Sequence, residues 1–189
     1  MIEVQQQRNY QVTWRFISLK ILNNDRGYAA HPEYEGIHDA GLIGLRIASA
    51  ARNHGGNDAV AKVYTGIGTA FHINKRLDEM MADPSAFYTR LLADIGLPKE
   101  LSQAWNDTSH DDVIGHETQA ALERTGKDVG TPILTFHPGS DTAASLFGPV
   151  ISKTPRGAEA LKLWDAVETL AASGVAEFKR SLRTAPDFS

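Results

Sequence analysis

The chain has 189 residues, of which 42% are hydrophobic and 22% are charged, and its formal net charge is -4. This length fits one domain, or one domain with a large insertion, and can bury a core. The weakly acidic balance, with no run of Lys or Arg, gives no reason to expect nucleic acid or an anionic membrane as a partner. No apolar run approaches the roughly eighteen residues that span a bilayer, and the N-terminus lacks the pattern of a secretion signal, so we expect a cytoplasmic protein.

The sequence contains no cysteine. This excludes disulfides, thiolate metal sites and a cysteine nucleophile within these 189 residues. The histidines include no close pair on one helix face, and His110, His116 and His137 with Asp111 and Asp112 fit no ligand spacing, so we predict no metal site. A Ser-His-Asp hydrolase stays open as an alternative, although the Gly-x-Ser-x-Gly elbow is missing.

The N-terminal part predicts a helix end followed by a strand. Residues 1–9 begin with apolar side chains and continue into a polar run, which is typical of the end of a helix. Residues 11–17 alternate and are rich in aromatic and β-branched side chains, which predicts a strand with Val12, Trp14 and Phe16 on one face. A polar loop at residues 23–27 follows.

From about residue 36 to residue 125 every periodic segment is helical. Gly55-Gly56 breaks the first helix, and an apolar stripe from Val60 to Phe71 predicts the next one. Asp83 should cap a helix that starts at Pro84, because an acidic side chain before a proline is a common helix start. A short helix over residues 98–105 and a longer one over 109–125 complete this block.

After residue 125 the spacing of apolar residues changes from the helical period to the alternation of a strand. Residues 133–136 and 143–147 predict two strands joined by a turn at 137–141, and helices are expected from Thr154-Pro155 onward and over 175–182. Together with residues 11–17 this gives a three-stranded sheet with one helix-rich insertion. Because the first strand is entered from the end of a helix, we expect a further β-α unit upstream of Met1.

Gly130, Thr131 and Pro132 open the first strand of the hairpin. A proline at the first position of a strand costs no ladder hydrogen bond, and the residue before it is held extended. A cis Thr131-Pro132 bond would leave the backbone groups of Gly130 and Thr131 free for a ligand, whereas an ordinary trans bond is the commoner alternative.

Four blocks of sequence carry a family resemblance: residues 17–26, 128–132, 147–157 and 162–165. They resemble the DsbA-like branch of the thioredoxin fold, and within it the actinobacterial mycothiol-dependent nitroreductase group, also described as DsbA family or 2-hydroxychromene-2-carboxylate isomerase-like proteins. The resemblance implies an α/β, thioredoxin-like fold with a large inserted all-helical domain. The thioredoxin-like domain would span 1–27 and 127–189, the insertion would span 36–125, and the Thr131-Pro132 bond would be cis.

For this family the resemblance implies a cytoplasmic reductase that takes electrons from a low-molecular-weight thiol, mycothiol or glutathione, through a Cys-Pro-Trp-Cys type motif. Residues 1–4 match the end of the helix that carries this motif, so the first strand and the cysteines are expected upstream of this sequence; loss of the motif is the alternative. The expected partners are a small thiol and an aromatic or disulfide substrate. Whether the protein is a monomer or a homodimer stays open.

The resemblance places further binding residues around the platform made by Gly130, Thr131 and Pro132. Asn23, at the end of the first strand, could bond a polar substrate or thiol, or only its own backbone. Tyr34, in the following loop, could donate to a nitro or quinone oxygen, or pack on the helical block. His72, at the end of a long helix, could line the cleft or bond helix-terminal carbonyls.

The family resemblance and the missing cysteines leave three candidate functions. The first is a thiol-dependent disulfide oxidoreductase or nitroreductase, inactive as given because it has no cysteine. The second is an isomerase of the same fold, in which the thiol cofactor itself attacks the substrate. The third is a non-catalytic binding module that pairs a partner with an exposed sheet edge.

Overall fold

The structure is a computed structural model that describes residues 1–23, 27–178 and 187. It separates into two compact units, which we describe one at a time. The hairpin unit comprises Met1–Val12 and Leu122–Ser189, and the helical unit comprises Thr13–Ala121. Assignment of the two units to a thioredoxin-like domain and an inserted helical domain stays a prediction.

The helical unit holds most of the helices, and α6 continues from it into the hairpin unit. Its described elements are α2 (Leu19–Asn23), α3 (Glu33–Gly68), the π-helical turn η1 (Thr69–Ile73), α4 (Leu77–Ala82), α5 (Pro84–Asp94), the 3-10 helices η2 (Lys99–Asn106) and η3 (Thr108–His110), and α6 (Asp111–Thr125). The hairpin unit holds α1 (Ile2–Gln7), β1 (Ile133–Phe136), β2 (Ala144–Phe147) and α7 (Gly157–Ala171).

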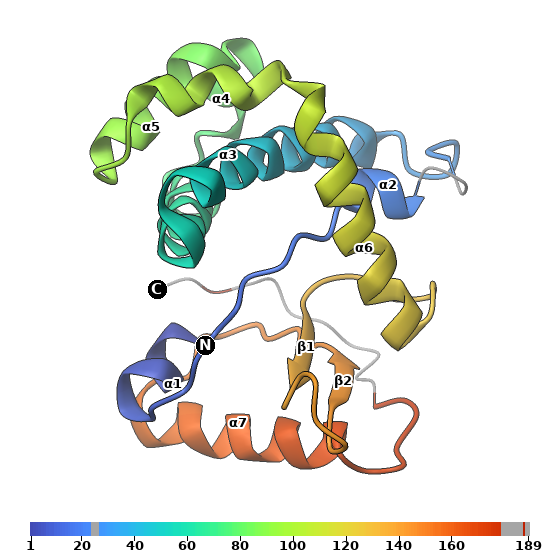
Figure 1. Cartoon of the computed structure of the whole chain (residues 1–189). Coiled ribbons are helices and arrows are strands. Elements are labelled where there is room, and N and C mark those ends of the chain that lie inside the picture. Colours follow the sequence, from blue (N-terminus) through green and yellow to red (C-terminus); the bar gives the residue numbers. More distant parts are fainter. Residues whose placement is uncertain (24–26, 179–186, 188–189) are drawn as a thin grey trace. The chain divides into compact units, whose positions relative to one another are not determined.

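Apolar side chains from four helices, which Figure 1 labels as α3, α4, α5 and α6, form the core of the helical unit. The largest side chains with no more than 2% exposure are Ile47, Val63, Met80, Phe87, Tyr88, Leu92 and Ile114. The helix starts and stops follow local sequence: the Asp83 carboxylate accepts the N–H of Ala86 at 2.9 Å, as predicted for this cap. The predicted break of α3 is also present, because Gly56 has a φ of +65°, which favours glycine.

The hairpin unit is built on α7, which contacts both α1 and β2 (Figure 1). β1 and β2 pair antiparallel, with Ile133 opposite Phe147 and Phe136 opposite Ala144, so the predicted hairpin is confirmed. Phe136 packs edge-on against Trp164 of α7, with ring centroids 5.1 Å apart. Tyr10, which follows α1, contacts the same indole at 5.4 Å.

The predicted strand over residues 11–17 is wrong, and among the described residues the sheet has two strands instead of three. The N–H groups at alternate positions of this segment donate to side chains of the helices, where a strand would bond a neighbouring strand. The acceptors are Asn57 Oδ1 for Trp14 (2.8 Å), Glu117 Oε2 for Phe16 (2.7 Å) and Thr118 Oγ1 for Ser18 (3.0 Å). The alternating pattern therefore marks extended backbone that is held by side chains of α3 and α6.

Two further differences concern the helices that were predicted after the hairpin. The helix predicted from Thr154-Pro155 begins at Gly157, where the Glu3 carboxylate accepts the Gly157 N–H at 2.8 Å. Of the last predicted helix, residues 175–178 are neither helix nor strand, and 179–182 lie outside the described residues. In the part of the chain that the structure describes, no helix is both long and apolar enough to cross a membrane.

Candidate functional site

The Gly130-Thr131-Pro132 platform leads directly into β1. The Thr131-Pro132 peptide bond is cis, which is the geometry that the family resemblance implied. The Pro132 carbonyl accepts the N–H of Gly148 at 2.8 Å and so continues the hairpin ladder by one bond. Thr131 and Pro132 are exposed, and Gly130 is partly buried.

The backbone of the platform has unused hydrogen-bonding capacity. Among the described residues, no hydrogen bond reaches the N–H or C=O groups of Gly130 and Thr131. A side chain at Gly130 would meet the ring of Phe147, since an ideal Cβ there lies 3.5 Å from Phe147 Cε2. Exposed backbone groups of this kind can pair with an extended polar ligand through main-chain hydrogen bonds.

We expect Asn23 at the end of a strand from the sequence, but this expectation is wrong. Asn23 is the last residue of the helix α2. Its amide Nδ2 donates to the Leu19 carbonyl at 2.8 Å, and its own carbonyl accepts the Gly27 N–H at 3.0 Å. The side chain therefore bonds the backbone of the first residue of its own helix, which is the local alternative that the sequence left open.

Tyr34 lies in the first turn of α3, so the expectation that it sits in a loop is wrong. Its ring stacks on His38 one turn later, with centroids 6.0 Å apart and planes inclined by 15°. The His31 ring also lies near Tyr34, with ring centroids 5.4 Å apart, and these three rings form an aromatic cluster. Tyr34 is 47% exposed, so a ligand can reach its phenol.

Tyr28 and Lys20 extend this aromatic cluster, and the sequence reading missed both of them and His38. The Tyr28 hydroxyl and His38 Nδ1 are 2.9 Å apart, and Lys20 Nζ lies 5.2 Å from the Tyr28 ring centroid while forming an ion pair with Asp39 at 2.9 Å. Burial lowers the pKa of His38, and the Lys20 charge lowers it further against the opposing effect of Asp39. The four-residue spacing of Tyr34 and His38, which both lie on α3, is the signal that could have revealed this part of the cluster.

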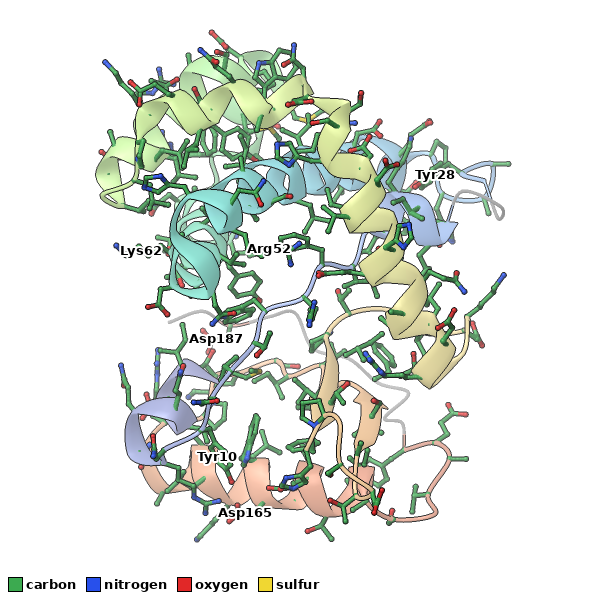
Figure 2. All side chains as sticks on the ribbon, viewed as in Figure 1. Tyr10, Tyr28, Arg52, Lys62, Asp165 and Asp187 are labelled. Atoms are coloured by element: carbon green, nitrogen blue, oxygen red, sulfur yellow. The ribbon has the colours of Figure 1, made fainter. Side chains whose placement is uncertain are left out.

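An open hollow of about 500 Å³ lies beside the aromatic cluster of the helical unit. It is lined by Lys20, Gly27, Tyr28, Ala29, Pro32 and Glu35. Figure 2 shows Tyr28 beside the end of α2. The hollow joins a cation, a phenol and a carboxylate to apolar walls, which is the mixture that an aromatic ligand with a polar substituent requires.

His72 lies away from this hollow. It belongs to η1, which follows the C-terminal end of α3, whereas Tyr34 is in the first turn of α3. Its side chain is exposed and already has an interaction partner. Within the described ranges, no group of three or more His, Asp or Glu side chains could hold a metal ion.

Comparison with known proteins gives one family. A family model described as Rv2466c-like, mycothiol-dependent nitroreductase Rv2466c, matches residues 1–180. An uncharacterized protein of Mycobacterium tuberculosis (strain ATCC 25618 / H37Rv), Rv2286c, is 32% identical over 171 residues, which cover 89% of this chain and 68% of the relative.

Proposed function

The chain belongs to the Rv2466c-like family of mycothiol-dependent nitroreductases, and we propose that Gly130, Thr131 and Pro132 bind the thiol co-substrate or its disulfide. The observation that carries this proposal is the unused hydrogen-bonding capacity of the backbone at the partly buried Gly130 and the exposed Thr131. An amide-containing thiol, laid antiparallel to this segment, would satisfy the N–H and C=O groups that no described residue bonds.

The sulfur that reacts must come from outside these 189 residues, since they contain no cysteine. Thiol chemistry needs a thiolate, which a protein supplies by lowering the pKa of a cysteine near a helix N-terminus or a cation. The proposed role of this chain is therefore to hold the small thiol and its partner in place. We expect the 189-residue chain to bind without turning over by disulfide exchange.

Two measurements on the 189-residue chain test this role. In an NMR titration, the disulfide of mycothiol or of glutathione should shift the amide signals of Gly130 and Thr131 first. In an assay of mycothiol-dependent nitro reduction, the chain should stay at background. Binding that leaves the amide signals of Gly130 and Thr131 unshifted would contradict the platform, and turnover would contradict the need for an outside cysteine.

A thiol-cofactor-dependent isomerase is the second candidate, favoured by the Tyr28–His38 pair and the hollow beside it. In such a reaction the cofactor thiol attacks an aromatic substrate and a protein acid or base moves protons, so the protein needs no cysteine of its own. Tyr34 belongs to this proposed aromatic site because its ring stacks on His38. The chain with added thiol should then isomerise a chromene carboxylate, and a Tyr28→Phe variant should lose this activity. Both results together would support this candidate over the reductase. Roles of Asn23 and His72 in binding stay predictions.

A further inference from the structure

The face of the β1–β2 hairpin that points away from α7 carries a polar pair. Side chains alternate across a strand, and Phe136 contacts Trp164 of α7, so Thr135 points to the opposite face. Ser145 is the cross-strand partner of Thr135 and shares that face. A hollow of about 260 Å³ opens here, lined by Arg124, Thr135, Pro138, Gly139, Ala143 and Ser145.

The two hydroxyl groups can donate to a ligand. Thr135 Oγ1 and Ser145 Oγ are 2.9 Å apart, and either atom can be the donor. Each hydroxyl has one hydrogen and two lone pairs, so the mutual bond uses one hydrogen and leaves the other to donate outward. The pair is therefore a fixed donor on the wall of the hollow.

Arg124 supplies a positive charge to the same hollow. It lies in the last turn of α6 and is exposed. Within the part of the chain that the structure describes, its guanidinium forms no ion pair and no hydrogen bond, and none of the six lining residues is acidic. A guanidinium with its donors unused beside a hydroxyl donor is suited to an oxyanion.

We propose that this hollow binds the carboxylate of a small organic acid. The planar guanidinium of Arg124 matches a carboxylate with two parallel N–H···O bonds, and one cation balances one negative charge. A phosphate dianion would leave a charge without a counterpart. Pro138 and Ala143 give the apolar body of the acid a surface to contact. This site goes beyond the proposed thiol platform and does not rest on it.

Titration of the labelled 189-residue chain with benzoate tests the proposal, with benzamide as the neutral analogue of the same shape and inorganic phosphate as the competing anion. Benzoate should shift the amide signals of Thr135, Gly139 and Ser145, and benzamide should not. Arg124→Gln should weaken benzoate binding roughly tenfold, because a charge-assisted bidentate pair is lost. Lys162→Gln is the matched control, since it removes an exposed charge from α7 in the same unit.

Thr135→Val gives a second, independent variant that keeps the side-chain shape and should weaken benzoate binding several-fold without touching the charge. Unchanged benzoate affinity in the Arg124→Gln chain, equal binding of benzamide, or no shift in the hairpin at millimolar benzoate would each overturn the site. Phosphate binding more tightly than benzoate would overturn the assignment to a carboxylate.

Discussion

The Glu117 carboxylate accepts the backbone N–H of Phe16 at 2.7 Å, so one side chain of α6 fixes the extended segment that precedes α2. The same carboxylate bonds Arg15 at 2.9 Å and Arg52 at 2.8 Å, and the Arg52 guanidinium lies 4.2 Å from the centre of the Phe16 ring. Only 12% of the Glu117 side chain is exposed. Its negative charge is therefore held in the protein by three donors.

Removing this carboxylate should destabilise the helical unit. Glu117→Ala leaves the Arg52 charge and the Phe16 N–H without an acceptor, and we expect the free energy of unfolding to fall by about 3 kcal/mol. Urea unfolding followed by circular dichroism measures this loss. Arg15→Gln is the control, because the Arg15 side chain is 68% exposed and its pair should contribute less than about 1 kcal/mol. An equal fall in the free energy of unfolding in both variants would show that the bond to the Phe16 N–H does not contribute to stability.

The same carboxylate should make stability depend on pH. Burial raises the pKa of Glu117, but the bonds from the Phe16 N–H, Arg15 and Arg52 outweigh it and hold the pKa below its ordinary value. A carboxyl whose pKa is lower in the folded chain stabilises the fold above its unfolded pKa of about 4.3. That contribution disappears as the pH falls through the folded pKa.

The urea midpoint of the natural chain should therefore fall more steeply below about pH 4.3 than that of Glu117→Gln. Glu79, whose pKa Arg76 and Arg90 lower to about 2, titrates in both proteins and cancels in the comparison. Parallel curves for the two proteins would contradict the role of Glu117.

Local signals in the sequence predicted a good part of the fold. Asp83 before Pro84 fixed the start of α5 because the cap bond closes within three residues. The alternation at 11–17 predicted a strand, which is wrong, because the alternation carries no information about what accepts the N–H groups. Those acceptors lie far away in sequence, 43 residues from Trp14 in one case and 101 residues from Phe16 in another.

In the candidate sites too, features made by neighbouring residues could be predicted, whereas features made by residues far apart in the sequence could not. The family resemblance implied a cis Thr131-Pro132 bond, and the structure has it. This feature could be predicted because the residues that carry it are consecutive in the sequence. The Tyr28–His38 bond and the position of Lys20 depend on how α2 meets the start of α3. No spacing rule links Lys20 to Tyr28 when the residues between them do not form one helix.

Gly130 offers a test of the platform that separates binding from stability. An added Cβ would lie 3.5 Å and 3.6 Å from the Phe147 ring, which is ordinary contact, so Gly130→Ala should change the free energy of unfolding by less than about 1 kcal/mol. Gly130→Val adds two methyl groups against the ring and should cost about 1–3 kcal/mol. Both variants should weaken disulfide binding, measured by the NMR titration, because the side chain covers the backbone groups.

Gly174→Ala is the matched control for these variants, since nothing lies within 4 Å of its added Cβ. This control should leave both stability and binding unchanged. Full disulfide affinity in Gly130→Val would show that the ligand binds elsewhere.

Replacing Tyr88 with phenylalanine should stabilise the folded chain. Its side chain is completely buried, and its hydroxyl has no hydrogen-bond partner among the described residues. The same burial raises the pKa of the phenol above its ordinary value. Tyr88→Phe removes an unsatisfied polar atom, and we expect the free energy of unfolding to rise by about 1 kcal/mol in thermal or urea unfolding.

Gly44 allows this prediction to be checked by a double-mutant cycle. An added Cβ at Gly44 would lie 3.3 Å from the Tyr88 hydroxyl and 3.2 Å from Ile67 Cδ1. Gly44→Ala should therefore cost less in the Tyr88→Phe background than in the natural chain. A loss of stability in Tyr88→Phe itself would reveal a bound water molecule that satisfies the hydroxyl.

The extended segment at residues 13–18 has a consequence for how copies of this chain behave at high concentration. A stretch with strand-forming composition and bare N–H groups invites edge-to-edge association with a second molecule. Here the N–H groups at alternate positions are covered by Asn57, Glu117 and Thr118. We expect protonation of Glu117, or substitution of any of these three acceptors, to leave a backbone N–H without its partner and to increase self-association.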